Sequence, residues 1–414
     1  MLEFSERIAS EEFAQAARHP DFPNAFTRSR KLPLPTLIGA LLTMRNQSQQ
    51  AMLDAFFASV NATHELSRVV SDRAFAKARD RLHLPALAAL NDLVVARADA
   101  AGLVPRWCGL RVVAADASLL MPATRACLLS RSGAERDQRL FVLYLPGAEL
   151  TLHASVHSQL VAERRMLVEA LDVLGPDDVL VLDRGYPAAW LIALLNARGI
   201  RFVMRCDNSA GWMATRKFMR SDAQQALVTI SAPSADEIAD WHCPPGPPSV
   251  RLVRQISPNG QTRVLVTNLD SAAFPAALFG DLYHQHWRIE EAFKRLKHPL
   301  KLECVSSLSQ HALIIDVAAK VLADNITSLM CTAASAQADL AAHSRKSNRA
   351  YAATAMQRLL PGLVLFLGNI AATVTHATAL LGATYQRLVP NRSRPNAIKF
   401  AQVIDMPGEV FEIR

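Results

Sequence analysis

The segment YHQHWRIEEAFKRLK, residues 283–297, contains the residue types that a site acting on phosphate groups needs. On a helix, four of its side chains would share one face, at intervals of three, four and seven residues: Tyr283, His286, Glu290 and Lys297. That face combines an aromatic ring, an imidazole, a carboxylate and an ammonium group, which suits phosphate and metal ions. The same segment also fits an ordinary solvated helix surface, where an acid pairs with lysines one turn away.

Two further carboxylates end apolar runs elsewhere in the chain. RVVAADAS, residues 111–118, contains Asp116, and VLVLDRGY, residues 179–186, contains Asp183. Both runs predict buried strands with an acid at the strand end, although an aspartate there also commonly begins a turn or caps a helix. Together with Glu290 they supply the oxygen ligands that Mg²⁺ or Mn²⁺ prefers. Two such ions, about 3.5–4 Å apart, can hold the attacking and leaving oxygens of a phosphoryl transfer.

These motifs resemble those of DDE transposases of the bacterial "insertion sequence four" family, whose signature is Y-x2-R-x3-E-x6-K. Tyr283, Glu290 and Lys297 match three of its four positions, and His286 stands where the family has arginine. The family's D-x-G-F/Y motif matches residues 183–186, and its D-G/A-S/T motif matches residues 116–118. FTRSRKLPL (26–34), SDRAFAKARDRL (71–82), TNL (267–269) and PNRSRP (390–395) extend the resemblance over most of the chain.

The resemblance implies a mechanism and a set of site residues. Two Mg²⁺ (or Mn²⁺) ions on Asp116, Asp183 and Glu290 would activate water to cut an element end, and then activate the freed 3′-hydroxyl to attack target DNA. Four side chains would bind DNA phosphates: Tyr283, His286, Lys297 and Lys294. The expected partners are double-stranded DNA, as terminal inverted repeats and target, and a second copy of the chain. Glu291 is a rival for the third ligand, but it lies about 100° around the helix from the Tyr283 face.

His286 is the one departure within the signature. A guanidinium is a permanently charged fork, whereas an imidazole is only partly charged near neutral pH and has fewer donors. Arg288 points about 200° away from His286 and cannot replace it. Three alternatives to an active transposase therefore stay open: a catalytically weakened or domesticated DNA-binding descendant, a ribonuclease-H-like nuclease without strand transfer, and a helical scaffold with scattered acids.

The composition favours a nucleic-acid partner without requiring one. The 414 residues include 45 Lys and Arg against 37 Asp and Glu, which gives a net charge of +8, and 50% are hydrophobic. A basic surplus attracts phosphate polymers, and it also suits anionic membranes. The six cysteines are scattered without C-x-x-C pairs, and the charged N-terminus lacks the apolar segment of a signal peptide. We therefore expect a cytoplasmic, nucleoid-associated protein without disulfides or a zinc site.

The element pattern predicts an α/β fold with a mixed sheet and a ribonuclease-H-like core. Residues 1–105 predict a helical N-terminal DNA-binding region, although its basic cluster also fits a solvated helix face. Residues 106–206 predict the first part of the core, with three strands, a helix, a strand, a helix and a strand. In that order the first and fourth strands are neighbours and bring their acids together. The basic cluster comprises Arg28, Arg30, Lys31, Arg73, Lys77, Arg79 and Arg81.

The remaining sequence predicts three further regions: a β-rich insertion at 207–275, the second part of the core with the signature helix at 276–345, and a helical C-terminal region at 346–414. The resemblance implies that an aromatic residue of the insertion supports a flipped base. Trp212 and Trp241 are candidates, and both also fit a core position. Residues 359–386 contain no charged side chain. Their polar residues favour a buried helix over a membrane span.

Overall fold

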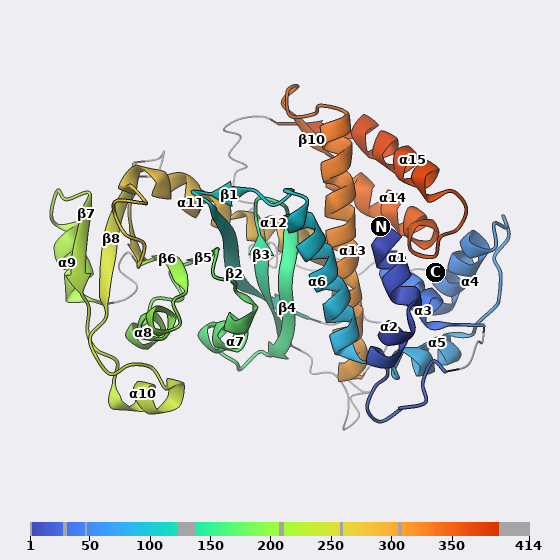
Figure 1. Cartoon of the computed structure of the whole chain (residues 1–414), viewed down its shortest axis with the longest axis horizontal. Coiled ribbons are helices and arrows are strands. Elements are labelled where there is room, and N and C mark those ends of the chain that lie inside the picture. The colour runs from blue at the N-terminus through green and yellow to red at the C-terminus, as the bar shows by residue number, and fades with distance from the viewer. Residues whose placement is uncertain are drawn as a thin grey trace, which may run out of the picture.

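A mixed β-sheet runs through the molecule and joins an insertion at one end to a cluster of helices at the other (Figure 1). The computed structural model describes residues 2–27, 31–45, 48–121, 137–206, 211–256, 260–304 and 309–388. The strand order is β4-β3-β2-β5-β6-β9-β8-β7, and β1 pairs with β2. The strands are β1 Arg106–Trp107, β2 Leu110–Leu120, β3 Gln138–Leu145, β4 Leu150–Ser158, β5 Asp178–Leu182, β6 Arg201–Arg205, β7 Gln225–Thr229, β8 Ser249–Ile256 and β9 Thr262–Thr267.

Helices pack against this sheet, and helices also form the N-terminal region. The α-helices are α1 Leu2–Ala9, α2 Glu11–Ala16, α3 Leu34–Thr43, α4 Gln49–Val60, α5 Asp72–Arg79, α6 Leu84–Ala100, α7 Glu163–Glu169, α8 Ala189–Ala197, α9 Met213–Met219, α10 Ala235–Trp241, α11 Phe279–His286, α12 Arg288–Lys297, α13 Gln310–Gln337, α14 Arg349–Val364 and α15 Ile370–Ala383. Short 3₁₀ turns lie at η2 Leu171–Val173 and η3 Ala276–Leu278, and a small ribbon joins β10 Arg345–Ser347 to β11 Tyr385–Arg387.

The core strands have the predicted ribonuclease-H-like order. The strands β2, β3 and β4 form an antiparallel meander, while β2, β5 and β6 run parallel. The first and fourth core strands, β2 and β5, are therefore neighbours, and this confirms the expected fold class. One detail differs, because Asp116 does not end its strand. β2 continues to Leu120, with Asp116 opposite Val142 of β3, since pairing with β3 supports the extra residues.

The two faces of the sheet bury different helices. Val113 and Ala115 of β2 belong to the core that includes side chains of α7 and α8, whereas Ala114 belongs to the core that includes α12 and α13. Because side chains alternate along a strand, Asp116 points to the same side as Ala114. The alternation along the strand therefore places this carboxylate on the face covered by residues 283–297, called here the signature segment.

The N-terminal and C-terminal helices share one hydrophobic core. Side chains from α1 to α6 pack there with those of α13, α14 and α15, and the three C-terminal helices lie beside the N-terminal ones in Figure 1. The charge-free segment at 359–386 is divided between α14 and α15, so the expectation of one buried helix was wrong. The first helix ends at Val364, Phe366 and Gly368 then adopt positive φ, and the Asn369 side chain caps α15 by accepting from the backbone N–H of Ala372. Within the described ranges, no helix is both long and apolar enough to cross a bilayer.

Buried asparagines join this helical cluster to the edge of the sheet. The Asn325 side chain of α13 accepts from the Thr151 backbone N–H at 2.7 Å and donates to its carbonyl at 2.8 Å. Asn91 of α6 donates to the same carbonyl and accepts from Asn325. These amides satisfy the free backbone groups of the edge strand β4, which would otherwise be buried without partners.

The insertion extends the same sheet and does not form a separate one. β9, β8 and β7 follow β6 in antiparallel order; α9 lies beside β7 at the left of Figure 1, and α10 lies below, next to α8. Both tryptophans named as candidates for base stacking pack in the core of this part. Trp212 is buried, and Trp241 stacks on Trp190 with ring centroids 4.3 Å apart. Neither lines the site described next.

Candidate catalytic site

The three predicted metal ligands line one cavity of about 330 Å³ at the carboxyl ends of the parallel strands. Asp116 comes from β2, Asp183 directly follows β5, and Glu290 lies in the first turn of α12. Parallel neighbours bring their carboxyl ends to the same edge of a sheet, which explains why residues so far apart in sequence meet here. The complete lining is Asp116, Asp183, Arg184, Arg205, Tyr283, His286, Trp287 and Glu290.

A tight loop holds Asp183 in place. Its Oδ1 accepts a hydrogen bond from the backbone N–H of Gly185 at 2.8 Å. A Cβ at Gly185 would approach that oxygen to 3.1 Å, which is tighter than most real Cβ contacts. Arg164 of α7 donates to the carbonyl of Gly185 at 3.1 Å and to that of Pro187 at 3.3 Å. The glycine of the D-x-G-Y motif is therefore needed for close approach, and α7 supports the loop from outside.

Asp116 has an unusual environment for a carboxylate. Burial raises its pKa to about 7, and the charges of Asp183, Glu163 and Glu290 add to the rise. A hydrogen bond from the backbone of Ala117 at 2.8 Å works in the opposite direction. Buried carboxylates crowded together disfavour each other's ionised forms. Burial and the neighbouring carboxylates therefore favour the protonated form of Asp116 in the ion-free cavity.

The signature segment is broken at Trp287 and does not form one continuous helix as predicted. Around the break, the backbone N–H of Trp287 donates to the His284 carbonyl, and the backbone N–H of Glu290 donates to the Trp287 carbonyl, both at 3.3 Å. These bonds span three residues, so the chain tightens locally before α12 begins. The side chain of Trp287 is 43% exposed at the edge of the cavity, and Glu290 is exposed.

Tyr283 and His286 line the cavity from α11, and both are largely buried. Their rings are nearly parallel, with centroids 6.0 Å apart. The His286 Nε2 lies 3.3 Å from the Ala115 carbonyl, an acceptor, so this nitrogen carries the proton. Burial lowers the pKa of His286, against the opposing effects of that carbonyl and of Asp183. In the absence of DNA, His286 is therefore a neutral ring that joins α11 to the residue preceding Asp116.

The two predicted phosphate-binding lysines do not line the cavity. Lys294 pairs with Glu291 at 2.7 Å on the exposed side of α12. Lys297 donates to the Leu119 carbonyl and lies 3.7 Å from Glu303. Helical spacing correctly brought Tyr283, His286 and Glu290 to one site, but Lys297 is two turns further and reaches the far end of β2.

Three residues of the cavity were missed by the sequence analysis: Arg184, Arg205 and Trp287. A signal existed for the arginines. Arg184 follows Asp183 directly, and Arg205 ends β6, a parallel neighbour of β5 whose carboxyl end must reach the same edge. No periodic signal marks Trp287, because its exposure depends on the break between α11 and α12.

The residues of the cavity suit divalent ions chemically. Carboxylate oxygens are what Mg²⁺ and Mn²⁺ prefer, and positive charge would relieve the repulsion recorded by the raised pKa of Asp116. Among the described residues, no three acidic, histidine or cysteine side chains already lie close enough to hold an ion. Of the three carboxylates that line the cavity, Glu290 is the most exposed.

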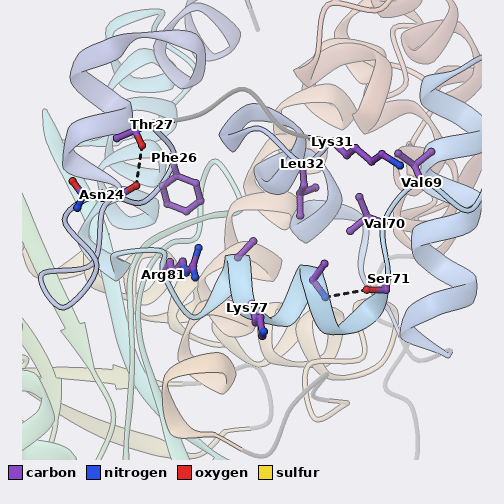
Figure 2. A pocket seen from close by; sticks show the side chains of 12 residues that line it. Asn24, Phe26, Thr27, Lys31, Leu32, Val69, Val70, Ser71, Lys77 and Arg81 are labelled. Atoms are coloured by element: carbon purple, nitrogen blue, oxygen red, sulfur yellow. Dashed lines mark hydrogen bonds between the residues drawn. The ribbon is translucent and has the colours of Figure 1, made fainter.

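A second and larger cleft, of about 1000 Å³, lies in the N-terminal region (Figure 2). Lys31, Lys77 and Arg81 contribute its positive charge, and no acidic residue lines it. Figure 2 shows these cations around a partly apolar floor that includes Phe26 and Leu32. Of the predicted basic cluster, Arg73 is exposed outside this lining, while Arg28 and Arg30 fall outside the described residues.

Arg79 was wrongly included in that basic cluster. Its side chain is fully buried and lies 3.2 Å from the carboxylate of Asp316 on α13. The helix α5 presents Arg79 to the core while Lys77 faces outward, because residues two positions apart on a helix point in different directions. This arginine is part of the packing between α5 and α13 and is not available to DNA.

The fold and the site together define a mixed-sheet enzyme core that carries acidic residues at the edge where parallel strands end. Residues 110–326, just over half of the chain, match the family described as "Transposase DDE domain". The match begins at β2 and ends within α13, so it covers all the residues that line the cavity. The chain belongs to this family of transposases. No curated protein matches the sequence.

Proposed function

We propose that this protein is a transposase of the "insertion sequence four" type, which cuts DNA at the ends of its element and joins those ends to target DNA. The observation that supports this most strongly is the convergence of Asp116, Asp183 and Glu290 on one cavity within a transposase domain. The residues between 283 and 297 match three of the four signature positions. A hydrolytic nuclease would share the carboxylates, and only a joining assay separates the two activities.

Asp116, Asp183 and Glu290 would hold two Mg²⁺ or Mn²⁺ ions in this cavity. When bound, such ions lower the pKa of a nucleophilic oxygen and stabilise charge on the phosphorus centre. The carboxylates contribute placement and charge. In the ion-free protein, Asp116 retains a proton up to about pH 7, so ion binding must displace it and should weaken at lower pH.

Arg184 and Arg205 would neutralise the scissile phosphate, since they are the cations that line the cavity among the described residues. Tyr283 remains a candidate for phosphate contact at the same wall. His286, neutral and bonded to Ala115, would position β2 and α11 until phosphate binding favours its charged form. Lys294 and Lys297 would contact phosphates of the flanking duplex, outside the cavity.

The basic N-terminal cleft would contact the element end. Its cations Lys31, Lys77 and Arg81 have no acid among the other lining residues, which suits a phosphate backbone. As a transposase of this type, the protein would act as a dimer on paired element ends at the bacterial nucleoid. Its partners would be double-stranded DNA of the terminal repeats and of the target.

The experiment that tests the proposal compares Glu290→Gln with Glu291→Gln. Both replacements are on exposed neighbouring positions of α12, but only Glu290 lines the cavity. With Mg²⁺ and a duplex that contains the element end, Glu290→Gln should abolish cleavage and keep DNA binding, while Glu291→Gln should cleave normally. Pre-cut ends then test joining. Cleavage by Glu290→Gln at the wild-type rate would refute the assignment, and cleavage without joining would identify a nuclease.

A further inference from the structure

The helix α12 carries Glu290 to the cavity, but α11 does not fix its direction, because the chain breaks at Trp287 between the two helices. The apolar side of α12 packs against the sheet and α13 through Ile289, Ala292, Phe293 and Leu296. Apolar contact is non-directional, so it buries this side without holding the helix in one position. Directional contacts come from Arg288 and Arg295, which are seven residues apart and share a face.

Glu149 contacts both ends of α12 from the turn between β3 and β4. Its Oε1 accepts from Arg288 Nη2 at 3.3 Å, and its Oε2 lies 3.7 Å from Arg295 Nη1. The backbone of Glu149 has φ +56°, a left-handed conformation that glycine and asparagine adopt more readily than glutamate. Strained residues persist where the surrounding structure determines them, and they cluster at functional positions. The contacts of its carboxylate offer a reason for a glutamate in this turn.

Two further charged residues extend these contacts to the C-terminal helices. The Asp324 carboxylate of α13 lies 3.5 Å from Arg295 Nη2 and 3.2 Å from Arg349 Nη2 of α14, and its side chain is only 6% exposed. Arg349 Nε also lies 3.7 Å from the Oε2 of Glu149, and Arg349 Nη2 donates to the Ser328 hydroxyl at 2.7 Å. One polar network thus joins the β3–β4 turn, α12, α13 and α14.

Stability alone does not explain this network. Taking charges out of water is costly, and apolar side chains of similar volume often replace buried ion pairs without loss of stability. Among the described residues, Arg295 Nε and Arg349 Nη1 are buried without a hydrogen-bond partner, so the network is also incompletely satisfied. Charged contacts of this kind can instead select one arrangement of the packed helices.

We propose that Glu149 is a positioning residue, which holds Arg288 and Arg295 so that α12 presents Glu290 to Asp116 and Asp183. The inference rests on the proposed function, because it assumes that Glu290 is catalytic. Glu149 does not line the cavity, so it acts through α12 and not on the DNA. A displacement of about 1 Å in a catalytic group can lower a rate about 100-fold, so a small shift of α12 is enough.

The test compares the cleavage rate at saturating DNA with the affinity for DNA, in the full chain with Mg²⁺. Glu149→Gln keeps the shape of the side chain, removes its charge, and should lower the cleavage rate by about 10–100-fold. DNA affinity should stay equal or increase, because the Arg288 side chain is 48% exposed and loses its carboxylate partner. A variant that is merely unstable would lose binding and cleavage together.

Two controls separate charge and position from general damage. Asp99→Asn removes a carboxylate that also meets two arginines, Arg106 at 2.6 Å and Arg111 at 3.4 Å, but these lie on β1 and β2. It should cleave at the wild-type rate. Glu149→Asp and Glu149→Asn share a shape and both suit a left-handed backbone, so they differ mainly in charge. The aspartate variant should cleave faster, and equal rates in this pair would overturn the inference.

Hydrogen exchange of the backbone amides of α12 tests the inference without DNA. Glu149→Gln should speed exchange in α12 by about 10-fold and leave exchange in β5 unchanged. Wild-type exchange in α12, or a wild-type cleavage rate in Glu149→Gln, would overturn the inference while the proposed function stands. If α12 exchanges faster in Glu149→Gln but the wild-type protein never cuts DNA, the proposed function fails and the positioning of α12 by Glu149 stands.

Discussion

Replacing Asp116 by asparagine should stabilise the metal-free protein above neutral pH. Burial is the main cause that raises the pKa of Asp116 from 3.8 to about 7. Because the folded-state pKa lies above the unfolded one, the folded chain holds the proton more tightly. Below about pH 4 the carboxyl is protonated in both states and costs nothing. As the pH rises from about 4 to about 7, ionisation increasingly destabilises the fold, and above that range the cost is complete.

The size of the effect follows from the same pKa difference. Moving from 3.8 to about 7 corresponds to about 4 kcal/mol in the free energy of unfolding. Water in the cavity screens part of that cost, so we expect Asp116→Asn to gain about 1–3 kcal/mol at pH 8. At pH 4 the variant and the wild type should be equally stable.

Urea denaturation followed by circular dichroism, in EDTA and at several pH values between 4 and 8, measures this difference. Asp222→Asn, a replacement at an exposed position, is the control and should show no such trend. Excess Mg²⁺ should stabilise the wild type at pH 8 and should do little for Asp116→Asn. A difference between Asp116→Asn and wild type that is constant with pH, or that grows toward low pH, would refute the reasoning.

Three further replacements test other parts of the account. Arg79→Met removes the buried ion pair with Asp316 and should lower the free energy of unfolding by about 3–5 kcal/mol in urea titrations; a loss of about 0–1 kcal/mol, typical of surface pairs, would contradict its burial. The double replacement Lys77→Gln with Arg81→Gln should reduce the slope of log affinity against log salt by about 2, measured by fluorescence anisotropy with end DNA; an unchanged slope would exclude the basic cleft from DNA contact. Trp287→Ala removes the exposed ring at the cavity and should weaken binding of DNA with a frayed end by about 1–3 kcal/mol, and equal affinity would show that no base stacks there.

Matched replacements control for charge and for ring loss. Lys217→Gln removes an exposed lysine of α9 in the insertion, far from the basic cleft, and should leave the salt slope unchanged. Trp287→Phe keeps an aromatic ring at the cavity and should retain most of the binding that Trp287→Ala loses. If Lys217→Gln also reduces the salt slope, the effect is due to lost charge in general and not to the basic cleft. If Trp287→Phe loses as much binding as Trp287→Ala, an aromatic ring at residue 287 is not what binds the DNA.

The strands of the core were predictable because their patterns are strong and local. Apolar runs at residues 111–118 and 179–186 predicted β2 and β5, and their parallel pairing then placed Asp183 near Asp116. The strand end after Asp116 was not predictable, because β2 continues only where β3 supplies hydrogen-bond partners. Pairing across the sheet is tertiary information that a single run of residues does not contain.

The side chains of the site were predictable in part for the same reason. Helical spacing brought Tyr283, His286 and Glu290 together, because three- and four-residue intervals survive the break at Trp287. Lys297 was not predictable, since its ammonium group follows a long side chain to a carbonyl of β2. Arg79 illustrates the same limit, because its burial depends on Asp316, a residue more than two hundred positions later in the chain.

The acidic cavity can be tested most directly by diffraction from crystals grown with Mn²⁺. The account predicts anomalous difference density for Mn²⁺ between the carboxylates of Asp116, Asp183 and Glu290, with Glu290 turned toward the aspartates. The same crystals of Glu290→Gln should lose part of that density. A well-ordered cavity without Mn²⁺ at saturating concentration, or with Glu290 directed away from bound metal, would contradict the claim that these three residues form the catalytic centre.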